Sequence, residues 1–327
     1  MPSTMQAIRF YSTGEPQEVL RVESLPIPEP GSGELRVRVQ ARPINPSDML
    51  FIRGTFGRHP ALPSPAGFEG AGIIDAVGDG VSMLPGTRVV VKTTGTWQEY
   101  QVVKPQEVIP IPDRLEIESA AQFAINPLTA WLLLEMLPPN FDGWILVTAG
   151  TSAVAKMILR LGTERGLRII SVVRKPQQVE ALKVLGDQTI IDVSTENISE
   201  RVESLTNGHG ISIAFDAVGG EQGTEVIQCL ASGGRMVIYG LLSEHPITVL
   251  PEEMIFKQLS IESFWLAPRL EQLGSEGKAV VIEQAMNAFC DSNLFAEVEQ
   301  RYELAEVHAA VAHNLRPDRL GKILLVG

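Results

Sequence analysis

The segment ILVTAGTSAVAKMILRLG, residues 145–162, decides the fold of the second half of the chain. It begins as an apolar strand, passes through a turn of small residues and continues with helical periodicity. Small side chains at such a turn let backbone N–H groups at the helix N-terminus approach a pyrophosphate, which the helix dipole also favours. The usual glycine pattern is incomplete, because Ala153 and Ala155 follow Gly150 where glycines are common. Taken alone, the segment is a weak signal for a dinucleotide site.

The series that follows this segment strengthens the signal. Apolar runs alternate with amphipathic stretches in units of about 25–30 residues, the pattern of right-handed βαβ crossovers. Strands are predicted at 144–148, 168–173, 188–192, 211–216 and 235–239, and helices at 152–165, 177–185, 197–205 and 221–230. Near-continuous apolar strands separated by helices indicate a buried parallel sheet of the α/β class.

The first 120 residues have a different character. Short apolar runs at 35–39, 72–77 and 88–91 are separated by turn signals rich in Gly and Pro, which predicts a β-rich domain. Further elements are predicted as a helix at 119–137, a turn at 274–278, a helix at 280–289 and a closing strand at 322–326. Such a last strand can return to the first domain, and a length of 327 residues suits two domains.

The end of the second predicted strand carries the cofactor preference. NAD enzymes usually place Asp or Glu there to hold the ribose 2′-hydroxyl. Here Arg174 and Lys175 occupy that position, and a guanidinium can grip a 2′-phosphate in a fork. The sequence therefore favours NADPH, although the two cations could also be an ordinary solvated strand end.

Composition excludes several classes of function. The formal net charge of −12 argues against a general nucleic-acid binder. No apolar run approaches the ~20 residues of a membrane helix, and the N-terminus lacks a signal-peptide layout. Cys229 and Cys290 are expected to be buried free thiols in a reducing compartment, so we expect a cytoplasmic protein that does not bind membranes.

Metal and hydrolase chemistry find little support. Five scattered histidines and two isolated cysteines give no zinc-ligand spacing, and no GxSxG elbow appears. His308 and His313 are expected on the surface.

The whole chain resembles the zinc-free branch of the medium-chain dehydrogenase/reductase superfamily. The motifs that carry the resemblance are INPSD at 44–48, PSPAGFEGAG at 63–72, TWQEY at 96–100, NPLTAW at 126–131, DAVGG at 216–220, GGRMVIYG at 233–240 and FWL at 264–266. Zinc-dependent members carry a Cys and a His as ligands of the catalytic metal. This chain has no Cys beside NPSD, and Phe68 stands in place of the His. Within the branch, the chain is most similar to quinone oxidoreductases and mitochondrial-type trans-2-enoyl thioester reductases.

The resemblance implies a domain plan and an assembly. It implies a GroES-like catalytic domain formed by residues 1–122 and 263–327, and a Rossmann doubly wound parallel sheet formed by residues 123–262. It also implies a homodimer that takes a small-molecule acceptor as substrate.

The resemblance further implies a set of site residues. The expected catalytic positions are Phe56, Asn126 and Trp265. The expected cofactor contacts are Asn126 near the nicotinamide, Thr151, Ser152, Ala153 and Val154 at the pyrophosphate, Arg174 and Lys175 at the 2′-phosphate, Tyr239, Gly240, Leu241, Leu242, Phe264, Trp265 and Leu266 beside the nicotinamide, and Lys322 closing the site. For several of these residues a structural role stays open. Asn126 could cap a helix, Tyr239 could be an ordinary strand-end aromatic, and Phe264 and Trp265 could belong to the core. Asn45, Pro46, Ser47 and Asp48 are expected to form a turn and helix cap rather than to touch substrate.

Phe56 marks a departure from the enoyl thioester reductases. These enzymes place a Tyr in the segment that here reads RGTFGRHP, and its hydroxyl helps to protonate or orient the substrate. General acid assistance typically contributes about 10²–10⁴-fold to a rate, and Phe has no proton to give. Quinone reduction needs less help, because a reduced quinone oxygen can collect its proton from water.

Two hypotheses follow from the sequence. The first is an NADPH-dependent, zinc-independent reductase of a quinone, an enone or a 2-enoyl thioester. The second is a dinucleotide-binding protein with weak or no catalysis, acting as a sensor or structural partner, which Phe56 and the alanines at 153 and 155 motivate.

Overall fold

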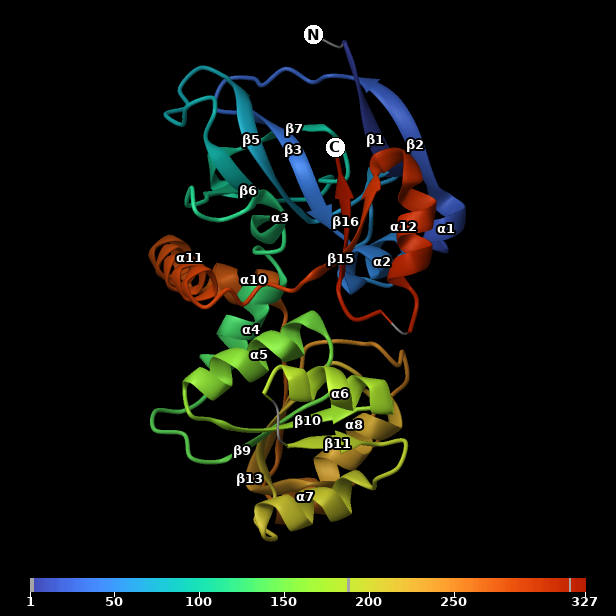
Figure 1. The fold of residues 1–327 in the computed structure, drawn as a ribbon, viewed down its shortest axis with the longest axis vertical. Coiled ribbons are helices and arrows are strands. Elements are labelled where there is room, and N and C mark those ends of the chain that lie inside the picture. The colour runs from blue at the N-terminus through green and yellow to red at the C-terminus, as the bar shows by residue number, and fades with distance from the viewer. Residues whose placement is uncertain (1–2, 187–188, 318) are drawn as a thin grey trace. The chain divides into compact units, whose positions relative to one another are not determined.

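The computed structural model describes residues 3–186, 189–317 and 319–327. It divides into two compact units, one formed by Met1–Asn126 and Phe295–Gly327 and the other by Pro127–Leu294 (Figure 1). The domain boundaries at 122 and 263 stay a prediction; the compact units divide after residues 126 and 294, so residues 263–294 pack with the second unit. The physical reason is local packing, since α10 (Leu266–Gln272) contacts α11 (Gly274–Asp291) and Arg160 donates a hydrogen bond to the Ser292 carbonyl.

The first unit contains two β-sheets. The smaller sheet has the order β2 (Leu20–Pro26), β1 (Thr4–Phe10), β4 (Ser64–Pro65). The larger has the order β15 (Val298–Glu303), β16 (Lys322–Val326), β3 (Leu35–Pro43), β5 (Glu69–Val77), β6 (Arg88–Lys92), β8 (Val108–Pro110), and β7 (Tyr100–Val103) pairs with β3. This sheet confirms the predicted β-rich, GroES-like character of the first domain.

The last strand ties the two segments of the first unit together. β16 pairs antiparallel with β3 and parallel with β15, so the predicted return of the C-terminal strand is confirmed. Short helices fill the connections: α1 (Pro16–Val19), α2 (Pro46–Arg53), η1 (Pro105–Glu107), α3 (Ile117–Ala120), η2 (Leu304–Glu306) and α12 (Val307–Asn314). The apolar faces of β1, α2, α12 and β16 share one core, which includes Phe10, Phe51, Val311 and Ile323.

The second unit is an all-parallel sheet. Its order is β11 (Ile190–Asp192), β10 (Arg168–Val173), β9 (Trp144–Val147), β12 (Ile211–Asp216), β13 (Leu230–Ile238), β14 (Ser260–Ser263). Numbered along the chain, this order is 3-2-1-4-5-6, the order of doubly wound dinucleotide-binding sheets. The helices of this unit are α4 (Asn126–Leu134, whose first residue belongs to the first unit), α5 (Ala153–Glu164), α6 (Pro176–Val184), α7 (Ile198–Thr206), α8 (Gly220–Gln228), α9 (Pro251–Phe256), α10 and α11.

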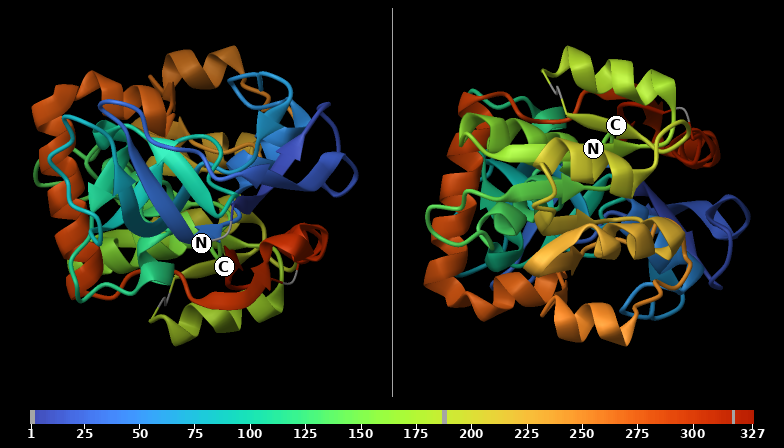
Figure 2. Two further views of the ribbon diagram at one scale, coloured as in Figure 1. Left: turned by 90° about the horizontal axis from the view of Figure 1, so that it is seen from above. Right: turned by 90° about the horizontal axis from the view of Figure 1, so that it is seen from below.

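Helices cover both faces of this sheet. Ile198 of α7 and Val226 of α8 share a core with Leu146, which places both helices on one face. Leu182 of α6 lies beside Gly150 and Ser171, and Ser171 alternates with the side chains of that core. α6 therefore covers the opposite face, as the view from below in Figure 2 also shows. Burial on both faces explains why the strands read as continuous apolar runs.

Several predicted elements differ from the structure. The helix predicted at 119–137 is divided into α3 and α4, because Pro127 sits where a new helix begins. The turn predicted at 274–278 is wrong, since these residues are the first turns of α11. The strand predicted at 188–192 begins on a residue outside the described ranges, and Ile190–Asp192 is its described part.

Two expectations about single side chains also need correction. Both cysteines are free, but Cys290 is only partly buried. His313 is not a free surface residue, because it bridges Tyr302 and Glu299 by hydrogen bonds of 2.9 and 3.0 Å. In the part of the chain that the structure describes, no helix is long and apolar enough to cross a membrane.

Candidate functional site

Four of the predicted cofactor segments lie at one edge of the parallel sheet. Residues 151–154 follow β9, residues 174–175 follow β10, residues 239–242 follow β13 and residues 264–266 follow β14. Because all these strands are parallel, their carboxyl ends meet at the same edge. Ligands of doubly wound sheets bind outside this edge, where the strand order reverses. Here the order reverses between β9 and β12.

The turn between β9 and α5 is shaped for close approach. Ser152 caps α5, because its Oγ accepts a hydrogen bond from the Ala155 amide at 3.2 Å. Ala149 adopts a left-handed conformation with φ of 49°, which costs energy for a residue other than glycine. A Cβ on Gly150 would lie 3.1 Å from Ser171 and 3.2 Å from Leu182, so this position requires a small residue.

A buried carboxylate fixes the base of the turn. Thr148 Oγ1 donates to Asp216 Oδ1 at 2.6 Å and accepts from the Ala217 amide at 2.9 Å. Asp216 also accepts from the Gly219 amide at 2.8 Å and from the Val218 amide at 3.2 Å. These bonds join the carboxyl ends of β9 and β12 and hold the DAVGG motif against the turn.

Tyr239 brings a polar group to the same edge. Its hydroxyl is buried and has no hydrogen bond of ordinary geometry among the described residues. Burial and the nearby charge of Asp216 raise the pKa of Tyr239, while the adjacent Ser152 side chain acts in the opposite direction. A buried hydroxyl with an unused bond, next to the turn between β9 and α5, fits a ligand that carries hydrogen-bonding groups.

Gly240, which follows Tyr239, allows its own backbone to run close to the backbone of Ala217. A Cβ there would lie 2.7 Å from the Ala217 carbonyl oxygen. The neighbouring Leu241 and Leu242 are 56 and 53% exposed, and Trp265 is 46% exposed. Phe264 is buried, and its amide donates to the Ile238 carbonyl at 2.8 Å. The core interpretation therefore suits Phe264 and does not suit Trp265.

Arg174 and Lys175 are available at the end of β10. Arg174 is exposed, and its backbone amide donates to Gln178 Oε1 at 3.0 Å. Within the described residues neither side chain makes a hydrogen bond or an ion pair. Two such cations at the end of β10 have the charge that a phosphate group requires. The carboxyl edge of the sheet thus brings the predicted residues Ser152, Arg174 and Tyr239 to one side of the second unit.

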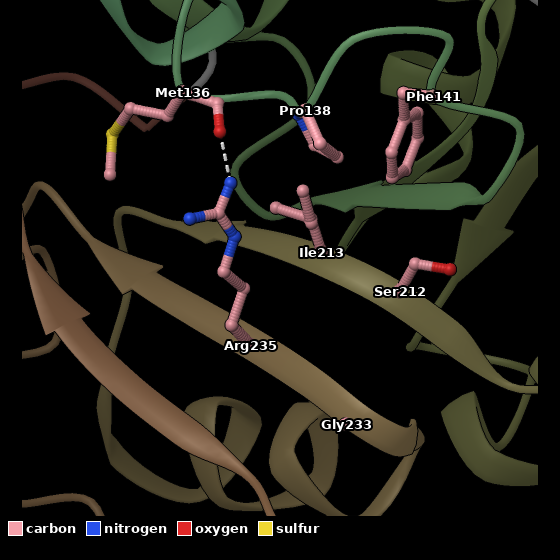
Figure 3. Close-up of a pocket in the computed structure, with 7 residues that line it drawn as sticks. All are labelled: Met136, Pro138, Phe141, Ser212, Ile213, Gly233 and Arg235. Atoms are coloured by element: carbon pink, nitrogen blue, oxygen red, sulfur yellow. Dashed lines mark hydrogen bonds between the residues drawn. The ribbon is translucent and has the colours of Figure 1, made fainter.

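A separate hollow lies near the other ends of the strands. It has a volume of about 340 Å³ and is lined by Met136, Pro138, Phe141, Ser212, Ile213, Gly233 and Arg235 (Figure 3). The Arg235 guanidinium donates to the Met136 carbonyl across it. None of the predicted site residues lines this hollow.

In the first unit, Phe56 belongs to a group of aromatic rings. Its ring lies 5.4 Å from that of Phe68, which in turn lies 4.9 Å from Phe51. The Arg58 guanidinium lies over Phe51 and Phe68 at 5.6 and 5.4 Å, and it donates to Thr94 Oγ1 at 2.6 Å. Phe56 therefore brings apolar surface, and no acid, to this region.

Next to Phe68 lies a buried set of polar side chains, here called the Lys322 cluster: Asn45, Asp48, Glu69, Asn126 and Lys322. Lys322 Nζ donates to the Asn45 side-chain oxygen and to the Ile44 carbonyl. Asn45 Nδ2 donates to Glu69 Oε1 at 2.8 Å, and Asn126 Nδ2 donates to Asn45 Oδ1 at 3.1 Å. The cluster joins β5, β16 and the starts of α2 and α4.

Burial shifts the ionisation of the charged members. It raises the pKa of Asp48 to about 7 and that of Glu69 to about 7, although the Lys322 ammonium acts against both shifts. Burial lowers the pKa of Lys322 to about 8, and the Glu69 carboxylate acts against that shift. Near neutral pH, one buried ammonium therefore stands between two carboxyl groups that are partly protonated.

The cluster changes the interpretation of several predicted residues. Asn45 caps α2 and Asp48 Oδ2 accepts from the Asn45 amide, which confirms the expected turn and helix cap. Asn126 stands at the start of α4, but its side chain bonds to Asn45 instead of acting as a simple cap. Lys322 is expected to close the cofactor site, which stays a prediction; in the structure its ammonium is buried within the cluster. Glu69 was missed, although a carboxylate at the head of the apolar strand β5 was a visible signal.

Comparisons with known proteins match this architecture. Residues 31–113 match the family model described as "Alcohol dehydrogenase GroES-like domain", and residues 153–275 match that described as "Zinc-binding dehydrogenase". A mitochondrial enoyl-[acyl-carrier-protein] reductase from Bos taurus is 33% identical over 81% of this chain and 74% of its own length. The chain belongs to the medium-chain dehydrogenase/reductase superfamily.

Solved structures narrow the branch of this superfamily. A protein from Bacillus thuringiensis described as an NADPH:quinone reductase is 34% identical, with a TM-score of 0.93 over 99% of both chains. Etr1p, solved in complex with NADP and crotonyl-CoA, is 26% identical, with a TM-score of 0.87 over 99% of this chain and 100% of its own. The chain is an oxidoreductase of the quinone oxidoreductase and enoyl thioester reductase branch.

The zinc chemistry of other superfamily members has no matching ligands here. Phe68 precedes Glu69 in the GFEG motif, and a phenyl ring offers no ligand atom. Across residues 3–186, 189–317 and 319–327, no group of three or more His, Cys, Asp or Glu side chains is arranged to hold a metal ion.

Proposed function

We propose that this protein is an NADPH-dependent, zinc-independent reductase of an activated conjugated acceptor. The observation that carries the proposal is the convergence of four predicted segments on the carboxyl edge of the parallel sheet, beside the unpaired Arg174. Membership of the branch supports it, because relatives are named as NADPH:quinone reductase and as enoyl reductases.

Each part of the edge has its own task in binding NADPH. Backbone amides of residues 151–154 bind the pyrophosphate at the N-terminus of α5. Arg174 and Lys175 bind the 2′-phosphate, and Tyr239, Gly240, Leu241 and Leu242 line the nicotinamide side together with Phe264, Trp265 and Leu266. Asn126 orients the nicotinamide end. When bound, NADPH supplies the hydride.

The aromatic group of the first unit favours a flat, electron-poor substrate. Phe56 and Phe68 are only partly buried and offer ring surface, and Arg58 adds a positive charge over Phe68. A quinone or an enone suits such a surface. Phe56 supplies no proton, so acceptors that need acid assistance from this position are expected to react more slowly.

The test is NADPH oxidation against a panel of a quinone, an enone and a 2-enoyl thioester. We expect turnover with at least one acceptor, and a higher rate for the enoyl thioester in the Phe56→Tyr variant. Absence of turnover with every acceptor would overturn the proposal. If NADPH then still bound tightly, the alternative of a sensor or structural protein, which the missing hydroxyl favours, would replace it.

Assembly and location stay predictions. A homodimer is expected, and light scattering on the purified protein tests it. The cytoplasmic location is also a prediction. The Bos taurus relative described above is named as mitochondrial, so the compartment of this protein is not settled by its relatives.

A further inference from the structure

We infer that the Lys322 cluster sets the rotation of the Asn126 carboxamide, so that Asn126 offers an oxygen acceptor to the cofactor. The inference deepens the proposed function and rests on it, because it takes Asn126 as a cofactor contact. The ligand group that such an oxygen selects is a hydrogen-bond donor on the nicotinamide nucleoside, either the carboxamide NH₂ or a ribose hydroxyl.

The first step is the orientation of Asn45. A carboxamide can turn by half a rotation and exchange its oxygen and its NH₂ group, so its neighbours decide which way it points. Asn45 Oδ1 accepts from the Lys322 ammonium, which can only donate. Asn45 Nδ2 donates to Glu69 Oε1, which accepts when ionised. Only one orientation of Asn45 satisfies both neighbours.

Lys322 keeps this orientation even when Glu69 is protonated. The pKa of Glu69 is raised to about 7, so its carboxyl group changes state near neutral pH. Below its own pKa of about 8, Lys322 is an ammonium that only donates, and a turned Asn45 would place its NH₂ against it. Glu69 Oε2 meanwhile accepts from the Ile125 amide at 2.9 Å, which holds the backbone beside Asn126.

The second step passes the orientation to Asn126. Asn126 Nδ2 donates to the Asn45 oxygen at 3.1 Å. A turned Asn126 would bring its own oxygen against that oxygen, losing a hydrogen bond and adding a repulsion. One N–H of Asn126 is used inside the cluster, and Oδ1 lies at the other end of the carboxamide as the acceptor that Asn126 offers to a ligand.

The Lys322 cluster is a poor way to stabilise the fold if that were its only role, because its charged groups are buried. Lys322 is 4% exposed and Glu69 is fully buried, and buried ion pairs of this kind often stabilise a fold no better than apolar residues of the same volume. Ser47 Oγ and Asp48 Oδ1 are buried without hydrogen bonds in the described part of the chain. A fixed carboxamide offers a functional reason for keeping such a cluster.

The test uses a charge-matched double variant, Lys322→Met with Glu69→Gln. It removes one positive and one negative charge together, so that Glu69 is not left as a buried ion without its partner. Gln101→Leu is the control, because Gln101 is equally buried and bonds only to the Thr94 carbonyl, outside the cluster. Thermal melting confirms that all variants fold, and calorimetry measures cofactor binding without any need for turnover.

Two analogues of NADP⁺ separate the two possible donors. The 3-acetylpyridine analogue replaces the carboxamide NH₂ by a methyl group, and a 2′-deoxy analogue removes the hydroxyl of the nicotinamide ribose. One net hydrogen bond corresponds to about 2–10-fold in affinity. We expect wild type and Gln101→Leu to prefer NADP⁺ over one of the two analogues by this factor, and the double variant to lose that preference.

Asn126→Ala completes the cycle. This variant should also lose the preference for NADP⁺ over the analogue. The triple variant, Asn126→Ala with Lys322→Met and Glu69→Gln, should then show the same preference as Asn126→Ala alone. Retention of the preference in a folded double variant would overturn the inference, as would equal binding of both analogues and NADP⁺ by wild type. Failure of wild type to bind NADP⁺ or NADPH at all would instead overturn the proposed function.

Discussion

Each unit buries a carboxylate next to the expected site, and the two are held in different ways. Asp216 in the second unit accepts from one hydroxyl and two backbone amides, all from the ends of β9 and β12 or the turn after them. Glu69 in the first unit accepts from one amide side chain and one backbone amide, and it shares the Lys322 ammonium with Asp48.

The difference indicates that Asp216 has a structural role, whereas the Lys322 cluster can change its protonation near neutral pH. Asp216 is surrounded by fixed neutral donors, which stabilise its charge without a counter-ion. Glu69 and Asp48 depend on one buried cation, and burial places their pKa values near 7. We therefore expect changes around Asp216 to act through the stability of the turn after β9, and changes in the Lys322 cluster to act on stability, pH dependence and cofactor orientation together.

The largest effect is expected from Lys322→Met alone. It leaves two buried carboxyl groups without a counter-ion, and breaking a buried pair in this way costs roughly 3–5 kcal/mol. Urea unfolding at pH 8 should show this loss, and the double variant with Glu69→Gln should recover most of it. A single-variant loss below about 1 kcal/mol would show that the cluster holds no essential ion pair.

Asp216→Ala should come next. It removes the acceptor of three donors that stay buried, which we expect to cost about 2–4 kcal/mol in the free energy of unfolding. Thr148→Val, which keeps the carboxylate and two of its donors, should cost only about 1 kcal/mol. Equal losses for the two variants would contradict the idea that Asp216 organises this turn.

Asp48→Asn should change how stability depends on pH. Folding raises the pKa of Asp48 from 3.8 to about 7, so the folded state holds its proton more tightly than the unfolded state. The wild type is thus favoured at low pH and loses this contribution as pH rises from about 4 to about 7. Relative to wild type, Asp48→Asn should gain stability over this range, by about 1.4 kcal/mol for each unit of pKa shift. Unfolding curves at several pH values give the difference, and parallel curves would contradict the shift.

Arg174→Ala tests the cofactor edge, and its expected effect on the free energy of cofactor binding is smaller than the effects above. Losing charge-assisted bonds to a 2′-phosphate should weaken NADPH binding by about 10-fold or more and leave NADH binding unchanged. Lys183→Ala is the matched control, since Lys183 is an exposed cation on α6 that pairs with Glu180. Equal loss for both cofactors, or a loss in the control, would remove Arg174 from the 2′-phosphate site.

Local signals predicted much of the fold. β10 and β12 have the predicted bounds, because each is a continuous apolar run between clear turn signals. The turn predicted at 274–278 is wrong because two glycines suggested a break, whereas Gly274 begins α11 and Gly277 is tolerated inside it. Phe264 and Trp265 could not be told apart, because burial depends on the neighbouring elements.

The Lys322 cluster was beyond the reach of local patterns. Lys322 bonds to Ile44 across 278 residues of chain, and Asn45 bonds to Asn126 across 81. Periodicity and motif spacing act over tens of residues at most, so only the pairing of β16 with β3 brings these groups together. The segments along the sheet edge were within reach, because each follows a strand whose direction the βαβ pattern already sets.

The central claim is tested most directly by following the hydride itself. NADPH carrying deuterium at C4, prepared separately in each of its two stereochemical forms, is mixed with the protein and an enone, and the product is analysed by mass spectrometry. The account predicts that one form, and not the other, delivers one deuterium to the β-carbon of the product. A protein that consumes no NADPH with the enone or with a quinone, or a product without deuterium from either form, would contradict it.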